Sequence, residues 1–479
     1  MKKFYITTAI DYVNAKVHIG HSLEKIQADV LARYHRKLGE KVFFLTGTDE
    51  NAQKNVLAAK EKKIDVKKFV DENANFAKKT WQLLNISFDY FIRTTNKRVH
   101  WPGVKKIWTL CKKSGDIYKK KYTGLYCPGC EAFLKEKDLK NGLCPYHLRP
   151  PEKISEENYF FRLSKYQKEL ERIIAKEEIK IFPKTRKNEV LKFIKAGLED
   201  FSISRPTKRM RGWGIPVPGD RSQTIYVWFD ALINYLTGIG FGWDEKKFKK
   251  FWPADLHIIG KDILRFHAVY WPAMLLSAKI ELPKAIFVHG FITVSGQKMS
   301  KSLGNIINPQ DLVKKYGPDP VRYFFLREAS PFEDIDFTFE KFERRYEFDL
   351  AHDLGNLVLR VVSLAKREKI SFPKRFYLKD KTLKRKIEKT KKLFKKEMEK
   401  FELNKALVSL WELISFSNVY IDRKKPWQKR EKSIIKDLLL TLSEISEILF
   451  PFLPQTAQKI QTQLKKIKPQ ILFPKLKSS

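Results

Sequence analysis

Two short motifs hold side chains that could bind and activate a nucleoside triphosphate. The first is His18-Ile19-Gly20-His21, which lies between an apolar run and a helical pattern. The amino end of a helix presents unpaired backbone N–H groups to a phosphate, and Gly20 lets a flat ring approach the backbone closely. His18 and His21, three residues apart, can face one ligand. Alone, these four residues are also compatible with an ordinary loop.

The second motif is Lys298-Met299-Ser300-Lys301-Ser302, on a loop of small residues. Lys298 and Lys301 can reach a triphosphate as mobile point charges that neutralise developing negative charge. Alone, the segment is also compatible with a solvated basic loop, because lysine is abundant along the whole chain.

A third group of residues has the spacing of metal ligands. Two residues separate Cys127 from Cys130, and two separate Cys144 from His147. Short spacers of this kind let two turns hold one Zn²⁺ ion tetrahedrally, and four protein ligands indicate a closed, structural site. The alternative is unpaired core cysteines, which is the interpretation we give to Cys111. Four cysteines in 479 residues do not suggest a disulfide framework.

The elements that must position these motifs have the pattern of a parallel α/β sheet. Residues 4–8 and 41–45 have the pattern of strands, and residues 22–38 have the apolar stripe of a helix. A strand, a helix and a strand without a hairpin turn predict a parallel crossover. Ligands bind beyond the carboxyl ends of the strands in such sheets, and residues 8–21 and 47–49 lie at such ends. The α/β pattern resumes near residues 225–228, 256–260 and 285–288.

Changes in pattern along the chain predict its domain organisation. We expect a doubly wound, Rossmann-like parallel sheet, interrupted by an inserted zinc-knuckle domain and followed by an α-helical bundle. The predicted segments are 1–115 for the first half of the α/β domain, 116–223 for the insertion, 224–284 for the second half, 285–345 for a junction domain with the lysine loop, and 346–479 for the helical domain.

The charge of the chain favours an acidic partner. Lysine and arginine total 95 against 55 acidic residues, a net charge of +40, and each phosphate neutralised by such residues releases a counterion. A lysine-rich genome would produce the same excess without nucleic-acid binding. No apolar run is long enough for a membrane span, and polar residues interrupt the first apolar run too early for a signal peptide. We therefore expect a cytoplasmic protein with no membrane partner.

The first two motifs together resemble the defining motifs of class I aminoacyl-tRNA synthetases, in the expected order and context. The resemblance implies ATP-driven formation of an aminoacyl-adenylate, with Mg²⁺ accompanying ATP, and transfer to the terminal ribose of tRNA. It assigns catalysis to His18, Gly20, His21, Lys298 and Lys301. It assigns ATP binding to His18, His21, Gly260, Asp262, Lys298, Ser300 and Lys301.

Within that class the sequence is similar to methionyl-tRNA synthetases over nearly its full length, at residues 7–14, 44–50, 227–232 and 260–267 and in a single knuckle of bacterial type. The resemblance implies that Asp49 binds the α-ammonium group of methionine. A long, polarizable thioether suits an aromatic and aliphatic slot, although each aromatic is singly also compatible with a core position. The implied pocket residues are Ile10, Tyr12, Trp228, Ala231, Leu232, Tyr235, His267 and Tyr270.

Two departures from the family pattern lie beside this pocket. Asp11 stands where the family usually has an uncharged residue, and Asn51-Ala52 replaces the usual histidine-glycine. Valyl-, isoleucyl- and leucyl-tRNA synthetases carry a large editing domain, for which the insertion at 116–223 leaves little room. Cysteinyl-tRNA synthetase uses zinc to bind its substrate thiol. Four protein ligands here would leave no open position on the zinc, which argues against that use.

In the helical segment, Asn356 and Arg360 lie four residues apart on one helix face, and Trp427 follows later. The resemblance implies that these three residues read the CAU anticodon of tRNA(Met) by stacking and by contacts to base edges. Capping polar residues and a core tryptophan are the alternative. Some bacterial relatives dimerise through a C-terminal OB-fold, which this sequence does not show, so we expect a monomer.

Two other functions compete with this interpretation. An adenylyl-transferring enzyme of the same superfamily that acts on a small molecule would leave the basic helical segment unexplained. A zinc-knuckle RNA-binding protein would leave both ATP motifs unexplained. Methionine-dependent exchange between ATP and pyrophosphate distinguishes the three.

Overall fold

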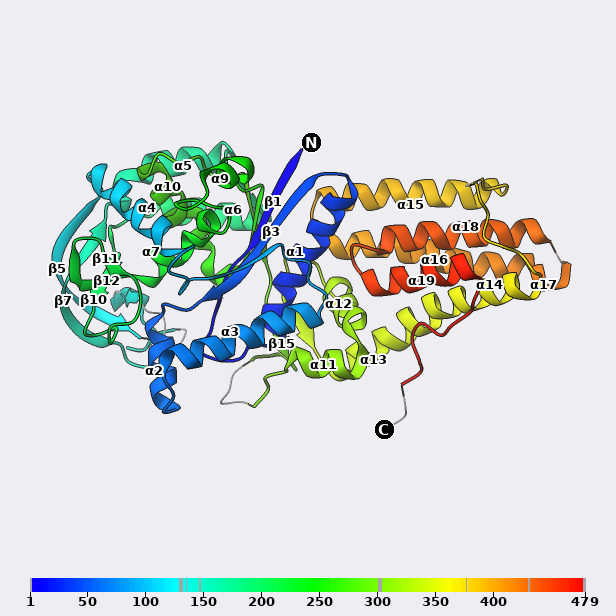
Figure 1. The fold of residues 1–479 in the computed structure, drawn as a ribbon, viewed down its shortest axis with the longest axis horizontal. Helices are drawn as coiled ribbons and strands as arrows, with labels where there is room; N and C mark the ends of the chain where they lie inside the picture. The colour runs from blue at the N-terminus through cyan, green and yellow to red at the C-terminus, as the bar shows by residue number, and fades with distance from the viewer. Residues whose placement is uncertain are drawn as a thin grey trace. The chain divides into compact units, whose positions relative to one another are not determined.

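Two compact units make up the chain in the computed structural model (Figure 1). Unit 1 comprises Met1–Val17, Gly39–Thr80 and Phe88–His289. Unit 2 comprises His18–Leu38, Trp81–Ser87 and Gly290–Ser479. The residues that the structure describes are 2–128, 132–134, 136–145, 148–299, 304–375, 377–429 and 431–476.

A parallel sheet forms the centre of unit 1, and its strands are β1 (Lys3–Thr8), β2 (Asp11–Tyr12), β3 (Lys41–Asp49), β4 (Tyr90–Arg93), β8 (Lys180–Phe182), β13 (Leu256–Gly260) and β14 (Ala285–His289). The strand order is β2-β3-β1-β13-β14-β8, and β4 also pairs with β3. All of these pairings are parallel. Every residue of β13 and β14 is buried, as expected for parallel strands that are covered on both faces.

The order of the strands reverses at β1, which lies between β3 and β13. Such a switch point opens a crevice at the carboxyl ends of the strands, where ligands bind in open α/β sheets. The predicted doubly wound fold class is therefore confirmed. The strand predicted at 41–45 continues to Asp49, and the helix predicted at 22–38 begins earlier, as α1 (Ile19–Lys37).

Two sequence expectations differ from the structure. The apolar run at residues 225–228 does not form a strand of the main sheet. It contains the end of β12 (Asp220–Ile225), which belongs to a small antiparallel sheet, and the start of α7 (Val227–Leu232). Strand β8 lies within the segment expected as an insertion, 116–223, yet it pairs with β14 of the main sheet.

Three small sheets, in which most pairings are antiparallel, form the rest of the described β-structure. In unit 1, β6-β5-β7-β9 and β10-β12-β11 are separate sheets, and in unit 2 the order is β16-β15-β17, in which β15 and β17 pair in parallel. Their bounds are β5 (Ile117–Cys127), β6 (Ala132–Leu134), β7 (Glu152–Phe161), β9 (Phe201–Ser202), β10 (Ser204–Pro206), β11 (Pro216–Val217), β15 (Ile292–Val294), β16 (Gln297–Lys298) and β17 (Ile335–Phe337).

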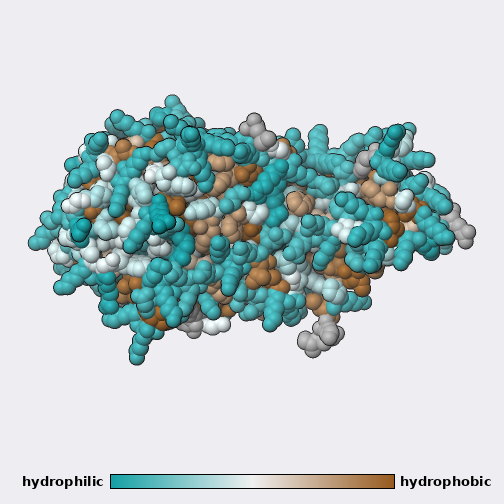
Figure 2. Space-filling model, viewed as in Figure 1, coloured by the Kyte–Doolittle hydropathy of each residue, from teal (hydrophilic) through white to brown (hydrophobic). Residues whose placement is uncertain are grey.

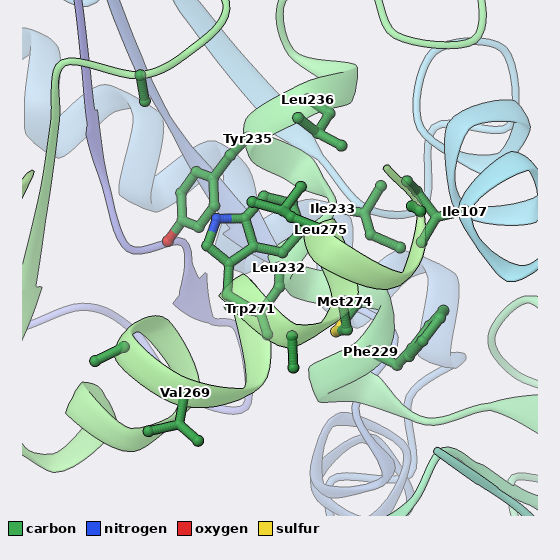
Figure 3. Close-up of a cluster of buried hydrophobic side chains, with 14 of the residues drawn as sticks. Ile107, Phe229, Leu232, Ile233, Tyr235, Leu236, Val269, Trp271, Met274 and Leu275 are labelled. Carbon is green, nitrogen blue, oxygen red and sulfur yellow. The ribbon is translucent and has the colours of Figure 1, made fainter. Parts of the chain in front are cut away.

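The core of unit 1 lies between the sheet and its helices, and Figure 3 shows part of it. Phe229 and Leu232 from α7 pack there with Trp271 and Met274 from α10, and with Ile107 from α4. The helices of this unit are α2 (Gln53–Glu61), α3 (Val66–Leu83, whose last turn belongs to unit 2), α4 (Trp101–Lys113), α5 (Gln167–Ala175), α6 (Lys184–Lys195), α8 (Asn234–Thr237), α9 (Glu245–Phe251) and α10 (Trp271–Ser277).

Unit 2 is mostly helical, and the long helices of its C-terminal part form a bundle (Figure 1). Helices α15, α16 and α18 pack on one another, and α14 packs on α18. Besides α1, the helices of unit 2 are α11 (Pro309–Tyr316), α12 (Pro318–Arg327), α13 (Phe339–Arg345), a π-helix (Tyr346–Gly355), α14 (Asn356–Arg367), α15 (Lys381–Glu399), α16 (Leu403–Lys424), α17 (Pro426–Lys429), α18 (Lys432–Leu449) and α19 (Pro454–Lys466).

A buried ion network fixes α1 within unit 2. The side chains of Arg322 on α12 and Asp29 on α1 are fully buried, and Arg322 Nη2 lies 2.8 Å from Asp29 Oδ2. Arg322 also donates to the carbonyl oxygens of Phe452 at 2.7 Å and Pro451 at 3.1 Å. Arg33 lies 2.7 Å from the same carboxylate. These contacts link the helix that begins at the histidine motif to the turn after α18.

Hydrophilic residues cover most of the face shown in Figure 2, as the abundance of lysine requires. In the described part of the chain, no helix combines the length and the apolar character that crossing a membrane demands.

Candidate functional site

The carboxyl ends of β1 and β3 bring three of the predicted methionine-binding residues together in unit 1. Tyr12 on the short strand β2 is the register partner of Asp49, the last residue of β3. Asp49 is buried, whereas Ile10 and Tyr12 are half-buried. Asp11, a departure from the family pattern, is buried and pairs in register with Thr48. A carboxylate and an aromatic ring therefore sit side by side at the sheet edge.

Helix α7 supplies an aromatic wall beside this edge. The rings of Trp228 and Tyr12 meet edge to face, with centroids 6.3 Å apart. Trp228 also stacks on Phe266, with centroids 3.7 Å apart and planes 5° from parallel. Phe266 was missed as a site residue, although it directly precedes His267 in the motif at 260–267. Lys54 Nζ lies 3.0 Å from the centroid of the Tyr12 ring, a cation–π contact.

His267 and Tyr235 engage each other rather than standing free. His267 Nε2 lies 2.7 Å from the Tyr235 hydroxyl, and His267 Nδ1 lies 3.0 Å from the Ile263 carbonyl oxygen. Tyr5 donates to the Tyr235 carbonyl oxygen at 2.6 Å. His267 lies in a single π-helical turn, Phe266–Tyr270, a distortion that is frequent at functional sites. Both imidazole nitrogens thus have protein partners.

The remaining predicted wall residues differ in exposure. Ala231, Leu232 and Tyr235 are buried, and Figure 3 shows Leu232 and Tyr235 among the core side chains. Tyr270 is half-buried and stacks on Phe201, with centroids 4.5 Å apart. Burial raises the pKa of the Tyr270 hydroxyl, so it stays protonated. Leu232 and Tyr235 therefore support the wall from the core, whereas Trp228 and Tyr270 are partly exposed.

The histidine motif forms the amino end of α1, in unit 2. His18 is the N-cap: its Nδ1 accepts from the Gly20 N–H at 3.1 Å, while His21 Nδ1 accepts from the His18 N–H at 3.2 Å. Because both Nδ1 atoms accept, each neutral ring carries its proton on Nε2. Burial, assisted by the nearby His21, lowers the pKa of His18 to about 3. His18 is therefore an uncharged donor at neutral pH.

Gly20 has no room for a side chain. A Cβ atom there would lie 2.9 Å from His18 Cε1 and 3.1 Å from the methyl carbon of Met299. The His18 ring thus packs directly on the backbone of Gly20.

The structure brings the described part of the lysine loop to the same helix end, within unit 2. Met299 packs beside Gly20, and the Ile19 N–H donates to the Ile307 carbonyl oxygen at 3.2 Å. Lys298 ends β16 and is exposed. Ser300 and Lys301 lie outside the described residues. Met299 of the lysine motif is therefore a neighbour of the histidine motif, almost 280 residues away in sequence, at the amino end of α1.

The other two predicted ATP-binding residues belong to unit 1. Gly260 is the buried last residue of β13, and Asp262 is exposed in the 3₁₀ turn Lys261–Ile263. Their position at the carboxyl end of a central strand is the one that nucleotide ligands use in open α/β sheets.

The candidate zinc ligands are described only in part. Cys127 ends β5, Cys144 follows a short β-bridge, and both are buried. The Leu148 N–H donates to the Cys144 carbonyl oxygen at 2.8 Å. Cys130 and His147 lie outside the described residues, within which no metal-binding group of three or more ligands occurs. Two buried thiols at chain reversals are compatible with zinc.

Cys111 differs from these two cysteines. It is fully buried on α4, and burial raises the pKa of its thiol to about 12. It is an inert core residue, as the sequence predicts.

The three candidate anticodon readers are close together in unit 2. Asn356 begins α14, and Arg360 lies one turn later. The Arg360 guanidinium carbon lies 5.8 Å from the centroid of the half-buried Trp427 ring, on α17. Arg360 also forms an ion pair with Asp422 of α16. An arginine beside a partly exposed tryptophan is a surface on which a base can stack.

Comparisons with known proteins agree over nearly the whole chain. The family described as "tRNA synthetases class I (M)" matches residues 4–153 and 137–362, and the anticodon-binding domain of tRNA ligases matches residues 380–477. Methionine–tRNA ligase of Thermotoga maritima is 42% identical over 472 residues, which cover 96% of this chain and 74% of that protein. The Clostridium perfringens enzyme is 44% identical over 476 residues, 97% of this chain and 73% of that protein.

A solved structure, Mycobacterium tuberculosis methionyl-tRNA synthetase in complex with methionyl-adenylate, superposes with a TM-score of 0.92 at 37% identity, over 99% of this chain and 100% of that one. The ligand-free form of the same enzyme superposes with a TM-score of 0.85 at 34% identity, over 100% of this chain and 99% of that one. Sequence and fold agree over the same span, and the chain belongs to the methionyl-tRNA synthetase family of class I aminoacyl-tRNA synthetases.

Proposed function

We propose that this chain joins L-methionine to tRNA(Met) through a methionyl-adenylate, consuming ATP and releasing diphosphate and then AMP. Membership of the family supports the activity. The observation that carries it is the meeting of the histidine motif and the lysine loop, where Met299 packs beside Gly20 and Ile19 bonds Ile307.

In the first step, a carboxylate oxygen of methionine attacks the α-phosphorus of ATP. The bond from that phosphorus to the bridging oxygen breaks, and diphosphate leaves with the electron pair. Negative charge grows on the phosphate oxygens, so positioned donors and cations lower the barrier. His18 and His21 would donate from Nε2, while Lys298, Ser300 and Lys301 would hold the departing diphosphate. Members of this family generally use ATP with Mg²⁺.

The adenosine and the amino acid would bind at the carboxyl ends of the strands of unit 1. Asp262 would bind the ribose, and Gly260 would let the nucleotide approach the backbone. Asp49 would bind the α-ammonium group, and the aromatic wall would surround the thioether. Because both nitrogens of His267 already have protein partners, we assign it the positioning of Tyr235. Tyr12 and Trp228 then become the main candidates for contact with the substrate.

In the second step, a ribose hydroxyl at the tRNA terminus attacks the carbonyl carbon of the adenylate. The carbonyl–phosphate oxygen bond breaks, AMP leaves, and the hydroxyl proton is lost to solvent or phosphate. Asn356, Arg360 and Trp427 would read the anticodon, in or near the segment that matches an anticodon-binding domain. That match accounts for the helical bundle, which an adenylyl transferase for small molecules would leave unexplained.

We further propose one structural Zn²⁺ per chain, held by Cys127, Cys130, Cys144 and His147. The metal would stabilise the turns between β5 and β7, with no part in the reaction. We propose five functional segments, 1–115, 116–223, 224–284, 285–345 and 346–479. Strand β8, within the second segment, belongs to the main sheet. We also propose that the protein is a monomer in the cytoplasm. Sedimentation velocity would test the monomer, and fractionation of cells would test the location.

The activity is tested by exchange of labelled diphosphate into ATP with each of the twenty amino acids in turn. Methionine is expected to support exchange at least about 100-fold better than leucine or isoleucine, given the discrimination available to a tailored pocket. Comparable exchange with another amino acid would contradict the proposed substrate, and no exchange with any would contradict the activity. The Arg367→Met variant, altered at an exposed position, controls for the effect of substitution itself.

A further inference from the structure

A closed group of buried polar side chains joins the end of β3 to α7, entirely within unit 1. Asp230, near the middle of α7, is fully buried. Its Oδ2 accepts a hydrogen bond from Asn51 Nδ2 at 2.7 Å, and its Oδ1 lies 2.6 Å from His100 Nε2. Asn51 also donates to the Thr94 carbonyl oxygen at 3.1 Å, and His100 Nδ1 lies 2.8 Å from Thr237 Oγ1. Both oxygens of a buried carboxylate are thus bonded, as burial requires.

The two ends of this group carry the two halves of the proposed methionine site. Asn51 follows Asp49 by two residues, and Asn55 Nδ2 holds the Asp49 carbonyl oxygen at 3.2 Å. At the other end, Asp230 lies between Trp228 and Ala231 on α7. The hydrogen bond from Asn51 to Asp230 therefore spans from the ammonium-binding strand to the wall of the side-chain slot.

Apolar packing follows the same path. Ala52, next to Asn51, is fully buried against Tyr226 and Val227, at the start of α7. Tyr12 and Trp228, the two rings that meet edge to face, pack around this cluster. The dipeptide Asn51-Ala52, where this chain departs from the family pattern, thus fixes the position of α7 by one polar and one apolar contact.

We propose that Asn51 is a positioning residue for amino-acid selection, because its bond to Asp230 sets the separation between Asp49 and the wall on α7. This inference rests on the proposed function. The length of that gap decides which side chains fit when the α-ammonium group is bound. Misplacement of a binding group by about 1 Å can cost about 100-fold in rate. Loss of the bond should therefore weaken selection of methionine over other side chains before it impairs the handling of ATP.

The test compares Asn51→Ala with the wild-type enzyme in diphosphate exchange, with methionine and with leucine as the amino acid. We expect KM for methionine to rise about 10-fold, KM for ATP to stay within about twofold, and the ratio of kcat/KM for methionine over leucine to fall about 10-fold. Asn51→His, which restores a donor of the family type, should recover that ratio to within about threefold. Asn158→Ala removes another buried amide of unit 1, on β7, and should leave the ratio unchanged.

An equal fall in kcat for both amino acids, with the ratio preserved, would overturn the proposal, because a merely structural role predicts that result. An unchanged ratio would overturn it as well. If Asn51→Ala does not fold, Asn51→Gln tests the same gap, since it keeps the amide but adds one methylene, and the ratio must then shift by at least about threefold. Exchange by the wild-type enzyme without methionine dependence would instead refute the proposed function, so the two failures are distinguishable.

Discussion

The fully buried pair of Arg322 and Asp29 gives the sharpest prediction about stability. Replacing Arg322 by Met removes the guanidinium that lies 2.8 Å from Asp29 and bonds the carbonyl oxygens of Leu84, Pro451 and Phe452. Breaking a buried ion pair from one side costs about 3–5 kcal/mol, because the remaining charge stays buried. Orphaned carbonyl oxygens each cost about 1–3 kcal/mol, though the terms do not add fully.

Two observations limit this loss. Asp29 keeps Arg33 at 2.7 Å and the Ser87 N–H at 2.6 Å. Burial alone would raise the pKa of Asp29, but the charges of Arg322 and Arg33 and the bonds from Ser87 hold it below its usual value. We therefore expect Arg322→Met to lower the free energy of unfolding of unit 2 by about 3–5 kcal/mol, a large share of the ~5–15 kcal/mol typical of a protein.

Urea denaturation of Arg322→Met, followed by fluorescence and circular dichroism, measures this difference. The control is Arg367→Met, whose side chain is 55% exposed and pairs with the neighbouring Glu368; it should change stability by less than about 1 kcal/mol. Arg322→Met within about 1 kcal/mol of wild type would show that the buried network does not hold α1 in place.

Four further predictions concern the proposed sites. Trp427→Ala should leave methionine activation intact but lower kcat/KM for tRNA charging, by a factor that corresponds to about 1–3 kcal/mol, the value of one base–aromatic stack. Parallel losses in both assays would show that the tryptophan has only a structural role. Lys301→Ala should lower the adenylation rate at least about 100-fold with little change in the Kd of methionine, and exchange within a few-fold of wild type would refute the role of the loop. Cys144→Ser should reduce the zinc content from one ion per chain and speed amide hydrogen exchange in the β5–β7 region. Wild-type protein that is zinc-free yet fully stable would refute the proposed metal site. The folded state lowers the pKa of His18 from 6.5 to about 3, so the contribution of this residue to stability is complete above about pH 6.5. That contribution is lost as the pH falls towards 3, by up to about 1.4 kcal/mol per pH unit. His18→Asn should flatten this part of the plot of stability against pH, and an unchanged plot would contradict the burial of the ring.

Local patterns in the sequence were sufficient for the central strands. Runs such as residues 256–260 and 285–288 are mostly apolar, and the structure buries them within a parallel sheet. The histidine motif was placed at a helix start because a strand precedes it and an apolar stripe follows. Its capping geometry depends on ring orientation, which residue order does not specify.

The pairing of strands that are far apart in the chain was not predicted from the sequence. Strand β8 is only three residues long, and nothing near it indicates that it joins β14. The run at 225–228 looked like one strand because it is continuously apolar, yet the chain changes there from strand to helix, which periodicity cannot resolve over four residues.

The same limit applies to the site. Asn51 and Asp230 are 179 residues apart, and His100 and Asp230 are 130 apart, so no local spacing links them. Phe266 lies within the motif at 260–267, but it stacks on Trp228 from a π-helical turn, which the residue pattern does not indicate. The meeting of Arg360 with Trp427 was implied only by resemblance, and the structure supplies the contact.

The central claim is that one chain both activates methionine and transfers it to tRNA. The direct measurement is charging of two tRNA transcripts, one with a CAU anticodon and one with a changed anticodon, by this protein with labelled methionine and ATP. We expect about one methionine to be esterified per CAU transcript, with one AMP formed for each. Charging of the changed transcript should fall by at least about 10-fold, in line with recognition of an unpaired base. Methionine-dependent exchange without transfer to either transcript, or equal charging of both, would contradict it.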